Sequence, residues 1–139
     1  MGAWSQGSFD NDDARDWIWG ELEDAEGTEP IAKAFAAVLE ADDYLEAPEA
    51  SIGLAAAEVV AALLGKPAAK LPDEVASWVA GKRPPESGLV KTAQQVVQRI
   101  LKVSELKDLW AESSDSAKWQ QEVEGLLGRL GDKSGRESN

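Results

Sequence analysis

Residues 54–64, Leu-Ala-Ala-Ala-Glu-Val-Val-Ala-Ala-Leu-Leu, form the longest apolar run of the chain and are interrupted only by Glu58. Starting near Pro48 and closed by Gly65, this region predicts a helix that is apolar almost all round. Such a helix belongs at the centre of a fold, where its alanines let neighbouring helices approach closely. The run is too short to span a bilayer.

Amphipathic segments on both sides of this run predict the rest of the fold. Apolar residues recur there at helical spacing, and no segment shows the alternation that is typical of a strand. Asp10 or Asn11 is suited to cap the first helix, and Gly27 is suited to end it. The apolar stripes are Ala14, Trp17, Ile18, Leu22 and Ala25; Ile31, Ala34, Phe35, Val38 and Leu39; Val75, Trp78 and Val79; Leu89, Ala93, Val96, Val97, Ile100 and Val103; and Trp119, Val123, Leu126, Leu127 and Leu130.

We therefore expect an all-α single domain over residues 1–131, a compact bundle of about six or seven helices. Ser104 is suited to cap a short helix between the last two long ones. Residues 132–139 are polar, and we expect them to form a disordered tail.

The composition excludes several classes of enzyme. The 139 residues include no Cys and no His, which removes thiol nucleophiles, zinc–thiolate sites and catalysis of the Ser-His-Asp or Cys-His type. We expect no enzymatic activity, no metal site and no cofactor. The first residues lack the basic and apolar regions of a signal peptide, which predicts a cytoplasmic protein.

The net charge of −12 comes entirely from the amino half of the chain. Residues 1–65 hold fifteen acids and two bases, whereas residues 66–139 hold eleven acids and twelve bases. An acidic half repels the phosphates of nucleic acids and attracts a basic protein, although acidic faces also serve solubility alone. We expect neither nucleic acid nor a membrane as a partner.

Residues 1–17, MGAWSQGSFDNDDARDW, place aromatic side chains among glycines before the acidic start of a helix. This opening resembles that of a family of small, mostly bacterial proteins grouped as a domain of unknown function, DUF4259. The stretches LAAAEVVAA (54–62) and SELKDLW (104–110) resemble the family too. The resemblance implies a small helical domain without an assigned activity. The matching opening residues are Met1, Gly2, Ala3, Trp4, Gly7, Phe9, Asn11, Asp12, Ala14, Asp16 and Trp17, whereas Ser5 replaces the usual glycine.

Burial of the two aromatic rings of this opening, Trp4 and Phe9, would remove a large apolar area from water. We therefore expect residues 3–9 to fold back over the helices as an ordered strap, with Gly7 allowing a tight turn between the rings. A mobile recognition arm that becomes ordered on binding is the alternative.

Trp19 and Glu58 are the side chains that a simple bundle explains least. Trp19 lies beside its stripe, between Arg15 and Glu23, so it is either covered by a second layer of chain or exposed as a binding anchor. We take Trp19, Asp16 and Glu23 as the candidate partner-binding residues. Glu58, within the buried run, either pairs with a Lys, an Arg or an indole N–H or lines a pocket.

Three functions fit these observations. The first is a non-enzymatic interaction module that binds a basic protein surface, like an immunity protein or antitoxin, or like a nucleic-acid mimic that occupies a nuclease. The second is an all-α, Mg²⁺-dependent phosphate or nucleotide hydrolase, because carboxylates three residues apart share a helix face and can bind Mg²⁺. The third is a structural homo-oligomer. The carboxylate pairs are Glu21 with Asp24, Glu40 with Asp43, and Glu46 with Glu49.

Overall fold

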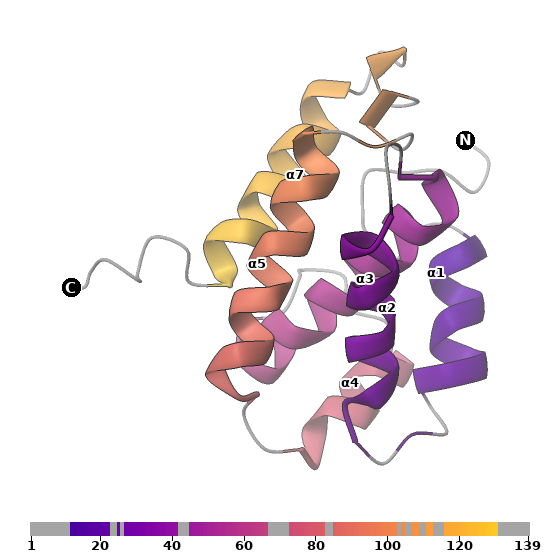
Figure 1. Cartoon of the computed structure of the whole chain (residues 1–139). Coiled ribbons are helices and arrows are strands. Elements are labelled where there is room, and N and C mark those ends of the chain that lie inside the picture. Colours follow the sequence, from indigo (N-terminus) through magenta and orange to yellow (C-terminus); the bar gives the residue numbers. More distant parts are fainter. Residues whose placement is uncertain are drawn as a thin grey trace.

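The computed structural model of the chain describes residues 12–22, 25, 27–41, 45–66, 73–82, 85–102, 104, 107–108, 111–112 and 116–130. Within these ranges every regular element is a helix, and Figure 1 shows the helices packed as one bundle. The all-α class predicted from the sequence is confirmed. The elements are α1 (Asp12–Trp17), η1 (Ile18–Leu22, a π-helix that continues α1), α2 (Glu29–Leu39), α3 (Ala47–Leu63), α4 (Asp73–Ala80), α5 (Ser87–Lys102) and α7 (Ser116–Arg129).

Helix α3 is the centre of the bundle, as the sequence predicts. It packs against α1, α2, α4, α5 and α7, and all of residues 53–63 are buried. Alanine is the best helix former and makes up much of this stretch, and its small side chain lets the surrounding helices come close. Among the helices of the described ranges, none has the length and apolar character that crossing a membrane requires.

Helix α3 has a clear signal at each end. Pro48 stands in the first turn of α3. Backbone N–H groups there have no carbonyl partner within the helix, so a proline, which lacks the N–H, removes no hydrogen bond. At the other end Gly65 has a φ of +85°, a left-handed conformation that favours glycine. The N–H of Gly65 donates to the carbonyl of Ala62, and that of Lys66 to the carbonyl of Ala61, both at 2.9 Å. This pair of bonds is a Schellman motif, so the predicted stop at Gly65 is confirmed.

The amphipathic faces predicted for the first two helical segments lie toward the core, with two differences. Leu39 is 37% exposed, so the prediction that it is buried is wrong. It is the last residue of α2 and stands beside the core-facing stripe rather than on it. The helical segment expected to reach Gly27 stops short of it, because η1 is Ile18–Leu22 and Ala25 is not helical; the N–H of Ala25 donates to the carbonyl of Leu22 (3.0 Å). The buried residues are Ala14, Trp17, Ile18, Leu22, Ile31, Ala34, Phe35 and Val38.

Helices α4, α5 and α7 bury the faces that periodicity assigns to them. Helices α5 and α7 pack together on the side of the bundle opposite α1 (Figure 1). Val79, Leu89 and Leu127 lie at the edges of their stripes and are only partly buried. The fully buried members are Val75, Trp78, Ala93, Val96, Val97, Ile100, Trp119, Val123, Leu126 and Leu130.

The predicted N-terminal strap lies outside the described residues. Helix α1 begins at Asp12, directly after the two residues expected to cap it. The predicted tail, residues 132–139, also lies outside the described ranges. The strap and capping residues that the structure does not describe are Trp4, Gly7, Phe9, Asp10 and Asn11.

Ser104 connects α5 to a helical segment that contains Lys107 and Asp108. Its side chain is buried, and its hydroxyl donates to the carbonyl oxygen of Ile100 at 2.9 Å. The same hydroxyl oxygen accepts a hydrogen bond from the backbone N–H of Lys107 at 3.0 Å. The second bond is that of an N-cap, which confirms the cap predicted at Ser104.

We expect Ser104→Ala to lower the free energy of unfolding by about 1 kcal/mol, because the capping bond is lost. Urea unfolding followed by far-ultraviolet circular dichroism measures the change. Thr92→Ala is the matched control, since the Thr92 hydroxyl donates to the carbonyl of Gly88 within α5 (2.9 Å) and starts no helix. Equal effects of the two substitutions would contradict the capping role.

Candidate interaction surface

The carboxylate of Glu58, in the middle of α3, is held by an arginine at the end of α7. Glu58 is 2% exposed, and Arg129 reaches it with both terminal nitrogens. Nη1 donates to Oε1 at 2.8 Å and Nη2 donates to Oε2 at 3.1 Å. Nη1 also donates to the carbonyl oxygen of Lys66 at 3.2 Å. This two-pronged pair fastens α7 to the central helix, so Glu58 has a structural role and is not part of the candidate surface.

The carboxylate pairs considered for Mg²⁺ lie only partly within the described ranges. Asp24 and Asp43 lie outside them, which leaves Glu46 with Glu49 as the complete pair among the described residues. In the part of the chain that the structure describes, no group of three or more carboxylates is placed to hold a metal ion.

Trp19 has half of its surface (50%) open to solvent, more than any other large hydrophobic side chain in the described ranges. It is carried by η1, and a π-helical turn is a rare conformation that is frequent at functional sites. The indole N–H donates to Oε2 of Glu74 on α4 at 3.3 Å. A carboxylate therefore orients the ring while half of its surface stays accessible.

Trp78, one turn after Glu74 on α4, holds this helix in the position that lets Glu74 contact Trp19. The indole N–H of Trp78 donates to the carbonyl oxygen of Ala25, just beyond η1, at 3.0 Å. The Nζ atom of Lys82 lies 4.5 Å from the centroid of the same ring, within the range of a cation–π contact. Because residues four apart share a helix face, the anchored Trp78 brings Glu74 to Trp19.

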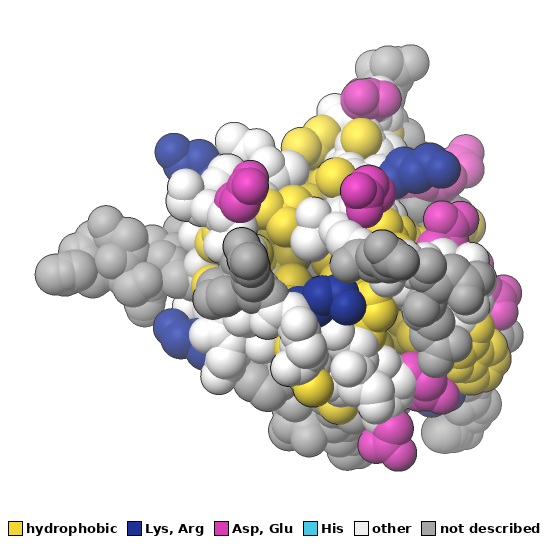
Figure 2. Space-filling view, turned by 90° about the horizontal axis from the view of Figure 1, so that it is seen from below, with side chains coloured by type: hydrophobic (Ala, Val, Ile, Leu, Met, Phe, Trp, Pro, Cys, Tyr) yellow, Lys and Arg dark blue, Asp and Glu magenta, His cyan; other side chains and the backbone are white. Residues whose placement is uncertain are grey.

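The charged residues around Trp19 are mostly acidic, although the exposed Arg15 stands one turn before it. Asp16 is exposed one turn before it on α1, and Glu21 is exposed after it on η1, whereas Glu23 lies outside the described residues. Figure 2 shows the molecule from below, with acidic side chains spread over the face and both hydrophobic and Lys or Arg side chains between them. Two of the three predicted partner-binding residues, Trp19 and Asp16, thus stand one turn apart on an exposed, acidic segment.

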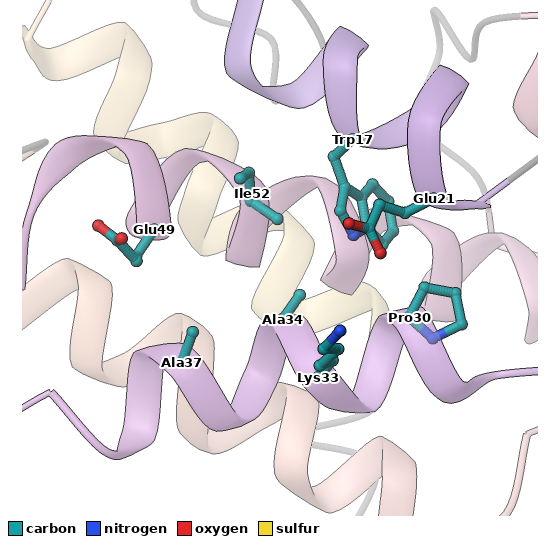
Figure 3. A pocket seen from close by; sticks show the side chains of 8 residues that line it. All are labelled: Trp17, Glu21, Pro30, Lys33, Ala34, Ala37, Glu49 and Ile52. Atoms are coloured by element: carbon teal, nitrogen blue, oxygen red, sulfur yellow. The ribbon is translucent and has the colours of Figure 1, made fainter.

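A groove lies between η1, α2 and the first turns of α3. Its volume is about 200 Å³, and Figure 3 shows its lining side chains. Ala34 and Ala37 stand one turn apart on α2 and line the groove with small side chains, Ala34 nearer to the ring of Trp17 and Ala37 nearer to Glu49 in Figure 3. The lining is mostly apolar and carries two Glu and one Lys. The lining residues are Trp17, Glu21, Pro30, Lys33, Ala34, Ala37, Glu49 and Ile52.

Glu49, at one end of this groove, has an unsatisfied oxygen. Its Oε1 atom is shielded from solvent, yet it accepts no hydrogen bond from any residue in the described ranges. Figure 3 shows this carboxylate beyond Ile52, with Glu21 and the Trp17 ring toward the opposite end and Lys33 projecting from α2 toward them. A buried acceptor without a donor costs free energy. Because this oxygen is closed to solvent, a molecule in the groove does not reach it in this structure.

Glu74, Lys33 and Glu49 were not predicted from the sequence as residues of a binding surface. Glu74 and Lys33 are ordinary charged residues of amphipathic helices, and Glu49 stands in the first turn of α3, so their neighbours on other helices could not be read from the sequence. The one local signal was the pair of alanines at positions 34 and 37, a spacing that leaves a gap on a helix face.

The comparison with protein families finds one model, described as Domain of unknown function (DUF4259), which matches residues 2–122. The match covers most of the chain, including the stretches LAAAEVVAA and SELKDLW on which the resemblance rests. No curated protein and no solved structure matches the chain.

Proposed function

Since this chain belongs to the DUF4259 family, a domain of unknown function, we propose its role from the surface around Trp19. The protein is a non-enzymatic interaction module that binds a basic protein partner through Trp19 and the acidic residues beside it. The proposal places it in the cytoplasm. Immunity proteins, antitoxins and nucleic-acid mimics that occupy a nuclease are modules of this kind.

The half-exposed indole ring of Trp19 carries the proposal. A ring left in water forgoes much of the free energy that burial of a large apolar side chain supplies. Trp is also enriched among the few residues that dominate binding at protein interfaces. The hydrogen bond from Trp19 to Glu74 (3.3 Å) restrains the ring, so less conformational freedom is lost when a partner covers it.

The charge around the ring supports a basic partner. Asp16 is exposed one turn before Trp19 and Glu74 contacts the ring from α4, so these two carboxylates outnumber the single base, Arg15, on this side of the helix. Opposite charges on two surfaces speed their encounter and exclude partners of like charge, including nucleic acids. The ring then supplies affinity, and the acidic residues supply the preference for a basic surface.

A peptide in which arginine alternates with serine tests the charge requirement. Its control carries citrulline, which keeps the shape of arginine without the charge. We expect calorimetric titration to detect binding of the arginine peptide alone. The affinity falls as salt rises from ~0.1 M to ~1 M, because the screening length shortens from ~10 Å to ~3 Å. Equal binding of the two peptides, or binding of neither, would contradict the proposal.

We expect Trp19→Ala to weaken binding of the arginine peptide at least about tenfold, or about 1.4 kcal/mol. The thermal midpoint should change little, because half of the Trp19 side chain is already exposed. Leu39→Ala is the matched control, since Leu39 is also an exposed large hydrophobic side chain (37%) but lies at the end of α2. A Trp19→Ala variant that binds like the wild type would exclude Trp19 as the anchor.

A further inference from the structure

We propose that the indole ring of Trp19 receives the guanidinium of a partner arginine, stacked on a face of the ring and hydrogen-bonded to the carboxylate of Glu74. The inference rests on the proposed function and specifies the chemical group of the basic partner that the ring recognises. It separates arginine from lysine, which a surface that recognises charge alone does not do.

The hydrogen bond of Trp19 occupies the edge of its ring. The indole N–H donates to Oε2 of Glu74 at 3.3 Å. An N–H bond of an indole lies in the plane of the ring, so this contact takes neither of the two aromatic faces. Half of the surface of Trp19 is open to solvent. The ring therefore offers a partner an accessible aromatic surface in a restrained orientation.

Trp78, the tryptophan that anchors α4, shows the same kind of contact within the chain. The Nζ atom of Lys82 lies 4.5 Å from the centroid of the Trp78 ring. A cation within ~6 Å of a ring centroid is attracted by the negative charge of the aromatic face, and Trp is the best of the aromatic residues for this contact. Among the described residues no cation is recorded over the ring of Trp19. Its face is therefore available to a cation of the partner.

The carboxylate of Glu74 beside the ring favours arginine over lysine. The indole N–H uses Oε2, and a carboxylate has a second oxygen that accepts hydrogen bonds. A guanidinium is flat and carries its N–H donors around its edge, so it can stack on the ring and donate to the neighbouring carboxylate at the same time. The ammonium group of lysine is a compact, strongly hydrated charge without a flat face. Lysine therefore makes the ion pair but not the stacking contact.

The remaining charges beside the ring leave the site with a net negative charge. Asp16 and Arg15 are both exposed about one turn before Trp19. Because residues three or four apart are neighbours on a helix surface, the Arg15 side chain starts close to the ring and repels an incoming arginine. The carboxylates of Asp16 and Glu74 outweigh this single base.

The first test compares the arginine peptide with a peptide in which lysine replaces each arginine. The two peptides have the same length and the same charge. We expect calorimetric titration of the wild-type protein to give about tenfold tighter binding of the arginine peptide. Arg15→Gln should strengthen binding of the arginine peptide about twofold, because a repulsion between exposed charges is removed.

The second test follows the preference for arginine over lysine in variants of the ring. Trp19→Phe keeps an aromatic face, whereas Trp19→Leu keeps apolar volume without one. We expect Trp19→Phe to retain part of the preference and Trp19→Leu to bind both peptides alike. Thermal unfolding of each variant verifies that the fold is retained.

The third test removes the charge of Glu74 and keeps an acceptor for the indole N–H. Glu74→Gln should reduce the preference for arginine at least about threefold, because the guanidinium loses its ion pair beside the ring. Asp73→Asn is the matched control, since Asp73 is the exposed acidic neighbour of Glu74 in the first turn of α4. The control should leave the preference unchanged. An equal effect of the two substitutions would exclude Glu74 as the partner of the guanidinium.

The outcomes separate this inference from the proposed function. Equal affinities of the wild type for the arginine and lysine peptides, or a full preference for arginine in Trp19→Leu, would overturn the ring as the guanidinium site. The proposed function would stand in that case if both cationic peptides bind and Trp19→Ala weakens both. A wild-type protein that does not distinguish arginine from citrulline would remove the proposed function and this inference together.

Discussion

Arg129→Met should lower the free energy of unfolding by about 3–5 kcal/mol, the largest effect expected of any single substitution considered for this protein. The substitution leaves the carboxylate of Glu58, which is 2% exposed, without the guanidinium that bonds both of its oxygens. A buried carboxylate that loses a two-pronged guanidinium keeps most of the cost of its dehydration, although Glu58 has a further interaction besides Arg129. Urea unfolding followed by circular dichroism measures the loss.

The double variant Glu58→Gln with Arg129→Met is the control for this first prediction. It removes the charge of Glu58 as well as the guanidinium, so no ionised carboxylate is left at this position of the core. Replacement of both members of a buried ion pair is often close to neutral, and we expect the double variant to regain more than half of the stability lost in Arg129→Met. If the Arg129→Met variant were as stable as the wild type, water would be able to replace the guanidinium at Glu58, and the prediction would be wrong.

Gly53→Ala should lower the free energy of unfolding by about 2 kcal/mol, although alanine favours a helix over glycine by ~1 kcal/mol. A Cβ atom at position 53 would lie 2.7 Å from Cγ2 of Val38 and 3.3 Å from Cγ1 of Val96. Val38 is fully buried on α2, and its branched side chain has little freedom to move aside. The close approach of α2 and α5 to α3 therefore requires a glycine at this position.

Gly125→Ala is the matched control for this second prediction, because Gly125 is also helical and a Cβ atom there would meet nothing within 4 Å. We expect this substitution to raise the stability by up to ~1 kcal/mol through helix propensity alone. The double variant Gly53→Ala with Val38→Ala should recover part of the loss, since the shortened side chain vacates the contact. Stabilisation by Gly53→Ala itself would mean that the packing of α2 on α3 adapts at little cost.

The sequence by itself determined the class of the fold, its central helix and most of the residues of the core. Residues 53–63 are buried because the run around them has no polar face, and the stripe of α5 is buried because its apolar residues recur at helical spacing. Periodicity failed where a stripe reaches the end of a helix, as at Leu39. In η1 it predicted the buried residues Ile18 and Leu22 correctly but not the π-helical backbone. A π-helix has no separate signal in so short a segment.

Only the tertiary structure decided which residues meet. The need of Glu58 for a partner was visible in the sequence, but its identity as Arg129, 71 residues away, was not. The contact of Trp19 with Glu74 and the groove that contains Glu49 likewise join separate helices. The physical reason is that helical periodicity tells which face of a helix is buried. Which other helix lies against that face, and at what height, depends on how all the helices pack together.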